Sequence, residues 1–163
     1  MRRSCELVVA LWCAGCAQSD YVDLTGVYRV DAELSSEPCG IDQPVAQPWP
    51  YLKFQESTTL SGFWLLRCSD RATMNCGGDM FLDAFPQPTD AGWIGELSDA
   101  SNTTPCVLLY SVRSARLDGD HLTVGIEDHS EEVPDADCSP REAELRSTLM
   151  PCTKHERFGA TRL

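Results

Sequence analysis

The side chains best able to do chemistry in this sequence belong to its nine cysteines. Three of them lie in the N-terminal region, and the others are Cys39, Cys68, Cys76, Cys106, Cys138 and Cys152. None of these six forms a Cys-x-x-Cys, and no two histidines stand at helical spacing, so the spacing predicts no metal site. In an exported chain an even number of cysteines predicts disulfides, here three. Cys68 and Cys76 are the preferred pair because they close a short loop, and the pairing of the other four stays open.

Carboxylates are the second chemical group that stands out. The chain has 25 acidic and 13 basic residues and a formal net charge of −12 at pH 7, so it repels nucleic acid. An acidic loop is expected from 130 to 137, with Glu131, Glu132, Asp135 and Asp137 as a candidate binding mouth for a cationic or neutral partner. The run lacks the spacing of a calcium-binding loop, and a merely solvated loop is the alternative.

No catalytic signature accompanies these residues. A nucleophile elbow, a His-Glu-x-x-His, a phosphate-binding loop and a dinucleotide fingerprint are all missing from the sequence. We therefore expect neither an enzyme nor a cofactor. Trp49, Trp64 and Trp93 could line a ligand pocket, although packing in a core is the more common use of tryptophan.

The N-terminus has the pattern of a signal peptide. Met1-Arg2-Arg3 is cationic, Leu7 to Ala14 is apolar, and small residues follow. The apolar run is too short to span a bilayer, which takes about 20 residues. The sequence thus predicts export, and the expected divisions are a signal peptide over 1–15, a tether over 16–23 and one folded domain over 24–163.

Ala14-Gly15-Cys16 resembles the lipobox of bacterial lipoproteins, in which two small residues precede the lipidated cysteine. The resemblance covers the leader, and it departs from the family at Cys13, where leucine is usual. It implies a lipid anchor on Cys16. Because Ala17 replaces the aspartate that tends to retain such proteins in the inner membrane, it also implies the outer membrane. The alternative is a freely secreted protein cut after Ala17.

Alternating apolar residues predict a mainly β fold. The eight expected strands cover 25–34, 51–56, 63–68, 80–85, 92–97, 106–117, 121–128 and 152–162. In the first strand, Tyr28, Val30, Ala32 and Leu34 should face inward, which leaves Glu33 in solvent. Asp118-Gly119 predicts a tight hairpin. Ser139-Pro140-Arg141-Glu142 predicts the start of a helix over 140–147, just before the last strand.

Eight short strands joined in sequence favour an antiparallel up-and-down barrel. The connections alternate between long and short, which would place all six cysteines at the end with the long loops. Thr25-Gly26-Val27-Tyr28 resembles the Gly-x-Trp that opens the lipocalin-like (calycin) barrels, with Tyr28 in place of the tryptophan. This resemblance implies a cavity for a small apolar ligand, although a barrel of this size can also be filled by its own side chains.

These observations together predict an exported, lipid-anchored, monomeric binding domain of the bacterial envelope without catalytic activity. Its partners would be the membrane, through Cys16, and a ligand or protein met at the acidic end. A lipocalin-like carrier of a small apolar ligand and a peptidase inhibitor are the two alternatives.

Overall fold

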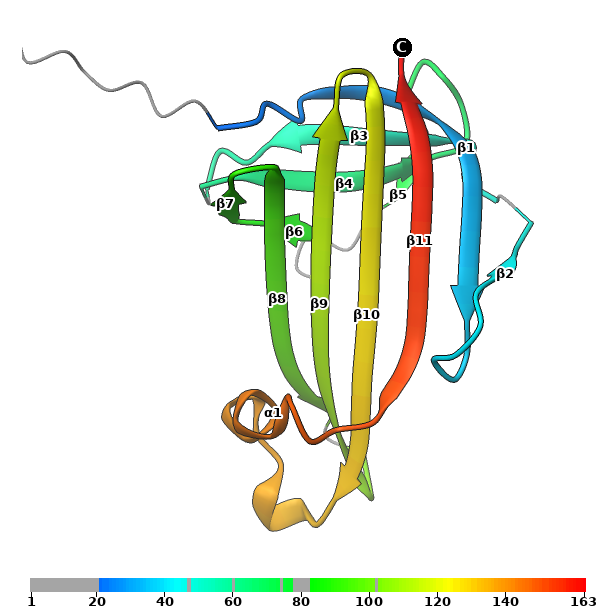
Figure 1. Cartoon of the computed structure of the whole chain (residues 1–163). Helices are drawn as coiled ribbons and strands as arrows, with labels where there is room; N and C mark the ends of the chain where they lie inside the picture. Colours follow the sequence, from blue (N-terminus) through cyan, green and yellow to red (C-terminus); the bar gives the residue numbers. More distant parts are fainter. Residues whose placement is uncertain (1–20, 47, 60, 74, 78–82, 102) are drawn as a thin grey trace, which may run out of the picture.

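The computed structural model describes residues 21–163 except 47, 60, 74, 78–82 and 102 (Figure 1). The described chain forms one antiparallel sheet with a short α-helix and a 3-10 turn. The elements are β1 (Gly26–Ser36), β2 (Gln43–Pro44), β3 (Tyr51–Glu56), β4 (Phe63–Cys68), β5 (Cys76–Gly77), β6 (Ala84–Phe85), β7 (Gln87–Thr89), β8 (Gly92–Ser101), β9 (Cys106–Asp118), β10 (His121–Val133), the 3-10 turn Asp135–Asp137, α1 (Pro140–Arg146) and β11 (Cys152–Arg162).

Local sequence signals hold closely. The strands β3, β4 and β11 have the predicted bounds, and Gly119 has φ 58° in the hairpin that joins β9 to β10. The helix begins as expected, because the Ser139 hydroxyl accepts a hydrogen bond of 3.1 Å from the backbone N–H of Glu142. The predicted strand over 80–85 lies partly outside the described residues, and its described part is the two-residue β6.

The sheet is not a closed eight-stranded barrel, so that prediction is wrong. It has eleven strands, and the main path runs β5-β4-β3-β1-β11-β10-β9-β8-β7, with β2 on β1 and β6 on β4. The chain crosses from β4 to β8 through β6 and β7, which are separated by Pro86. Pro86 and Pro88 lack backbone N–H groups, so this segment cannot supply a continuous ladder between the two sides.

The body of the sheet consists of β8 to β11 and β1, each at least 10 residues long (Figure 1). The strands β8 to β11 stand side by side, while β3 and β4 run across their upper halves. β8 and β10 continue past their predicted ends, to Ser101 and Val133. Much of the predicted acidic loop is therefore strand. The lower halves of these strands extend beyond the region that β3 and β4 cover.

Two apolar clusters lie on opposite faces of these strands. The inner cluster includes Tyr28, Phe54, Phe85, Trp93, Ala115 and Phe158. The outer cluster joins Leu108 and Val133 to Ala143 of α1 and to Met150. Leu108 and Ala115 are seven residues apart in β9, whose register with β10 is unbroken, so their side chains point to opposite faces. The helix thus covers the outer face of the lower sheet.

A bulge in β1 changes which side chains enter the interior. The register between β1 and β11 shifts between Val30 and Ala32. One extra residue reverses the alternation that follows it, so Ala32 is exposed and Glu33 is buried, with 8% of its surface exposed. The prediction that Ala32 faces inward and Glu33 lies in solvent is wrong for this reason.

The three disulfides join Cys39 to Cys152, Cys68 to Cys76 and Cys106 to Cys138. The preferred pair, Cys68–Cys76, is confirmed. Three disulfides are typical of an extracellular or periplasmic protein. In the part of the chain that the structure describes, no helix combines the length and hydrophobicity needed to cross a bilayer.

The disulfides do not all lie at one end of the sheet. Cys106 pairs with Val133 at the lower end of the long strands. Cys68 of β4 is the cross-strand partner of Tyr51 of β3, and Tyr51 is in turn the partner of Arg29 in β1. Because Arg29 lies opposite Thr161, near the end of β11, Cys68 falls near the upper hairpin. The reason is that β3 pairs with only the first four residues of β1, which brings the end of β4 to the upper part of the sheet.

Candidate functional site

A charged cavity lies on the inner face of the sheet, and we call it the inner cavity. Its volume is about 180 Å³. Six of its lining residues are charged and two are apolar: Arg67, Asp83, Arg113, Asp128, Lys154 and Glu156, with Leu109 and Ile126. The cavity is partly open to solvent, because the side chains of Arg67 and Lys154 are 22% and 38% exposed, whereas Arg113 and Glu156 are buried. A buried charge is stable only when it is paired and hydrogen-bonded.

Four strands position five of the six charged side chains, and the sixth, Asp83, directly precedes β6. Arg67 is on β4, Arg113 on β9, Asp128 on β10, and Lys154 and Glu156 are on β11. The side chains of these residues lie on the inner face of their strands, below the aromatic part of the inner cluster. The boundary is marked by Arg67, whose guanidinium carbon lies 5.1 Å from the centroid of the Phe158 ring.

Both carboxylate oxygens of Glu156 are paired in the inner cavity. Its Oε2 accepts a hydrogen bond of 3.2 Å from Arg67, and its Oε1 lies 2.8 Å from the Lys154 ammonium. Burial by itself raises the pKa of this carboxyl, but the hydrogen bond from Lys154 and the charges of Arg67 and Lys154 together lower it. Glu156 is therefore held as a carboxylate with both oxygens engaged.

Glu33 stands beside this pair under the opposite influence. Its Oε2 is buried and has no hydrogen-bond partner among the described residues. Burial raises the pKa of the Glu33 carboxyl, and the charge of Glu156 raises it further. The bulge in β1 thus places a second carboxyl in the interior. Its surroundings favour the protonated form, whereas the surroundings of Glu156 favour the carboxylate.

Two buried polar residues of β9, Arg113 and Ser111, belong to this part of the sheet. Arg113 is 3% exposed, and it lies across the sheet from Gly95 and Ile126. The buried Ser111 donates a hydrogen bond of 2.5 Å to the Asp128 carboxylate. The inner face of the lower sheet is consequently polar, in contrast to the aromatic face above it.

The predicted acidic mouth is not one convergent surface. Glu131 and Glu132 are consecutive residues of β10, so their side chains point to opposite faces. Glu131 accepts a hydrogen bond of 2.9 Å from Arg146 of α1, while Glu132 and Asp137 are exposed. The backbone of Asp135 begins the 3-10 turn. Glu131 acts mainly in holding the helix against the sheet.

The other residues singled out in the sequence lie apart from the inner cavity. Trp93 belongs to the inner cluster, where it packs edge-on against Phe63 at 5.0 Å and donates a hydrogen bond to the carbonyl of Val22. Trp49 and Trp64 are half-buried, and neither lines the cavity. The expected lipidation site, Cys16, and the expected signal peptide over 1–15 lie outside the described residues.

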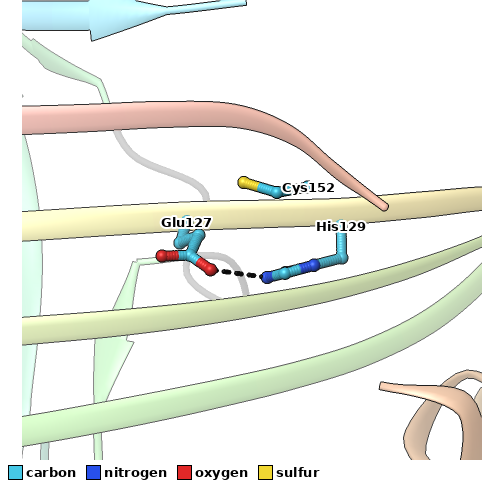
Figure 2. A group of neighbouring side chains, drawn as sticks. All are labelled: Glu127, His129 and Cys152. Carbon is cyan, nitrogen blue, oxygen red and sulfur yellow. Dashed lines mark hydrogen bonds and ion pairs between the residues drawn. The ribbon is translucent and has the colours of Figure 1, made fainter. Parts of the chain in front are cut away.

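One group of side chains has the composition of a metal site (Figure 2). Glu127, His129 and Cys152 each bring a potential ligand atom, and these atoms lie within 4.8 Å of one another. The sulfur of Cys152 is bonded to Cys39, so in the oxidised protein only the carboxylate and the imidazole are free to bind a cation.

The residues that line the inner cavity were not identified from the sequence, because their inward orientation depends on the register between strands. Arg113 falls on the same face of β9 as Ala115, a charge in an otherwise apolar alternation, and this could have been noticed in the sequence. Glu33 could not have been found in this way, because only the bulge places it inside.

In comparisons with known proteins, no family model, curated protein or solved structure matches the chain.

Proposed function

We propose that the chain is an exported, lipid-anchored, non-catalytic binding domain that holds a small ligand in the inner cavity. The observation that carries the proposal is the concentration of six charged side chains, of both signs, around one cavity inside an otherwise apolar sheet. Such an arrangement is costly for stability and is more often retained for a site than for a core.

The lining determines the class of ligand. Arg67, Arg113 and Lys154 can bind an anionic group, while Asp83 and Asp128 can accept hydrogen bonds from an ammonium group. The volume of about 180 Å³ limits the site to a small ligand. A zwitterion of the size of an amino acid fits both the charge and the volume.

The apolar-carrier hypothesis has less support. The upper interior is occupied by rings of the inner cluster, with Phe54 and Phe85 packed at 5.4 Å between centroids. The cavity below them has only Leu109 and Ile126 as apolar lining. Peptidase inhibition stays a prediction that no described contact favours.

The place where the chain enters the sheet bears on how an anchored domain would be oriented on a membrane. Trp93 binds the carbonyl of Val22 and Arg162 binds that of Asp23, so the N-terminal segment is fastened beside the Asp118-Gly119 hairpin. The helix and the Cys106–Cys138 disulfide are at the other end of the long strands (Figure 1). A lipid on Cys16 would leave that end facing away from the membrane.

Binding can be tested with calorimetry and thermal shifts on a panel of small zwitterions, anions and amines. Lys154→Met removes one cavity charge while keeping the length of the side chain, and Arg29→Met is the matched control in an exposed ion pair. We expect a zwitterion to bind the wild type and the control equally, and Lys154→Met to weaken binding by about tenfold or more, as for loss of a charged hydrogen bond. If no panel member binds, or if Lys154→Met binds like the wild type, the cavity is not the ligand site.

The anchor requires a separate test, which is the intact mass of the protein purified from its native envelope. We expect a chain that starts at Cys16 and carries a diacylglyceryl adduct, and no adduct on a Cys16→Ala variant. A wild-type chain that starts at Met1, or one without lipid, would refute the anchor and leave the cavity hypothesis standing.

A further inference from the structure

We propose that reduction of the Cys39–Cys152 disulfide creates a zinc-binding site from Cys39, Cys152, His129 and Glu127. This site is independent of the inner cavity and of the proposed ligand. Two thiolates, one imidazole and one carboxylate form a complete set for tetrahedral Zn²⁺. In the oxidised protein the same residues hold the disulfide and an ion pair instead.

The backbone brings these residues together. His129 on β10 is the direct cross-strand partner of Cys152 on β11, and the register shifts between Asp128 and His129. Glu127 lies two residues before His129 and so on the same face of the strand. The ligand atoms of Glu127, His129 and Cys152 are within 4.8 Å of one another, and Figure 2 places the carboxylate and the imidazole side by side on β10. The Cys39 sulfur is bonded to that of Cys152 but lies outside this group, so it would reach the metal by a movement of its side chain once the disulfide opens.

His129 has the orientation of a metal ligand. Its Nδ1 lies 3.1 Å from the carbonyl oxygen of Met150, and its Nε2 lies 2.8 Å from Oε1 of Glu127. A ring N–H held by a backbone carbonyl is the usual outer contact of a metal-bound histidine, because it fixes the ring and directs the other nitrogen to the metal. Here that other nitrogen points at a second potential ligand, Glu127.

The Cys39–Cys152 disulfide is also the most accessible of the three. Cys39 and Cys152 are both partly exposed. Each of the other two disulfides contains a fully buried cysteine, namely Cys68 and Cys106. Thiol–disulfide exchange requires approach of a thiolate to sulfur, so a dithiol should open Cys39–Cys152 first.

The chemistry of the conversion is balanced. A dithiol thiolate attacks one sulfur of the disulfide and forms a mixed disulfide, which the second thiol of the reductant resolves. The reductant leaves as its own cyclic disulfide, and Cys39 and Cys152 each end as a thiol. Zn²⁺ then replaces the protons of both thiols and takes the Nε2 lone pair of His129. Oxidation by a disulfide reverses these steps and releases the metal.

The loop that carries Cys39 stays attached when the disulfide opens. Pro44 of β2 pairs with Leu34 of β1, so this part of the loop remains in the sheet. Asp42 accepts a hydrogen bond from Ser36 at 3.2 Å and lies 2.9 Å from Nδ1 of His155. These contacts keep Cys39 near Cys152 without the covalent bond.

The test is titration of the full folded domain with Zn²⁺ before and after limited treatment with a dithiol, with Co²⁺ as a spectroscopic probe. Mass spectrometry after alkylation shows which cysteines are free, and circular dichroism shows that the sheet persists. We expect alkylation at Cys39 and Cys152 only, one zinc ion per reduced chain, thiolate-to-cobalt absorption, and no binding by the oxidised chain.

His129→Gln is the decisive variant, and Cys39→Ser is the second. We expect His129→Gln to weaken zinc binding by at least about 100-fold, the upper end of what loss of an outer contact costs. Cys39→Ser exposes the Cys152 thiol without any reductant, and it should give cobalt absorption of about half the wild-type intensity, from one thiolate. The proposal is overturned if reduced wild type and reduced His129→Gln bind zinc alike, if another disulfide opens first, or if the sheet is lost on reduction and folded Cys39→Ser binds no cobalt.

Discussion

The guanidinium of Arg162 lies across the ring of Tyr28, with its central carbon 5.3 Å from the ring centroid and Nη2 2.8 Å from the phenol oxygen. The same phenol donates a hydrogen bond of 2.8 Å to the carbonyl of Leu24. Burial raises the pKa of Tyr28 and outweighs the opposing effect of Arg162, so the phenol keeps its proton. This contact joins the first strand, the last strand and the entering chain at the upper end of the sheet.

Replacing Tyr28 with phenylalanine should destabilise the fold. The change leaves the Leu24 carbonyl and the Arg162 donors without the phenol, which costs about 1–3 kcal/mol for buried groups. The free energy of unfolding in urea measures this cost. The control is Arg29→Met in the exposed Arg29–Asp31 pair, which should change stability by less than about 0.5 kcal/mol. Equal effects of the two variants would show that the contact is not structural.

Two buried carboxyls should give stability changes of opposite sign. At neutral pH Glu33→Gln should stabilise the fold by about 1 kcal/mol, because a neutral amide replaces a buried carboxyl whose charged form is disfavoured and whose Oε2 has no partner among the described residues. Glu156→Gln should destabilise it by about 1–3 kcal/mol, less than the loss of a fully buried ion pair because the side chains of Arg67 and Lys154 are 22% and 38% exposed.

The pH dependence of these changes follows from the two pKa shifts. Because the pKa of Glu33 is raised in the folded protein, its protonated carboxyl contributes to stability. This contribution is complete below pH 4.5, the ordinary pKa of glutamate, and is lost as the pH rises through the folded pKa. The lowered pKa of folded Glu156 gives stability that is present above 4.5 and is lost as the pH falls through the folded pKa. Urea unfolding across this range should show the effects of both variants shrinking in acid. A Glu33→Gln variant that is less stable than wild type at neutral pH would contradict this account.

The crossing of β6 over β8 depends on Gly95. A Cβ at this position would lie 1.9 Å from the carbonyl oxygen of Ala84, which is backbone and cannot move aside freely. We expect Gly95→Ala to lower the free energy of unfolding by about 1–3 kcal/mol, the usual cost of overpacking. Gly159→Ala in β11 is the matched control, since a Cβ there meets no atom within 4 Å. If thermal unfolding of the two variants is the same, β6 does not pack on β8 in solution.

The disulfides should differ in their contribution to stability. Their sequence separations are 113 for Cys39–Cys152, 32 for Cys106–Cys138 and 8 for Cys68–Cys76. Loop-closure entropy then predicts contributions of about 5, 4 and 2.5 kcal/mol, in that order. Paired cysteine-to-alanine variants measured by urea unfolding check the ranking. A variant without Cys68–Cys76 that is the least stable of the three would show that loop-closure entropy does not set the order.

The sequence by itself determined the local elements of this protein. Alternation predicted β3, β4 and β11 to the residue, Asp118-Gly119 predicted the hairpin, and Ser139 predicted the helix start. These features depend on side-chain periodicity and on hydrogen bonds between near neighbours, which a short stretch of sequence specifies. The preferred Cys68–Cys76 pair belongs to the same class, because its loop is short.

Only the tertiary structure decided whether the sheet closes and which side chains lie inside it. Whether β4 meets β8 depends on how a proline-interrupted segment crosses between them, and no local pattern reports this. The burial of Glu33 depends on one extra residue in β1 relative to β11, a strand more than 100 residues later in the chain. Register between distant strands is set by packing of the whole sheet, so a single-residue shift moved a carboxyl from the solvent face into the interior.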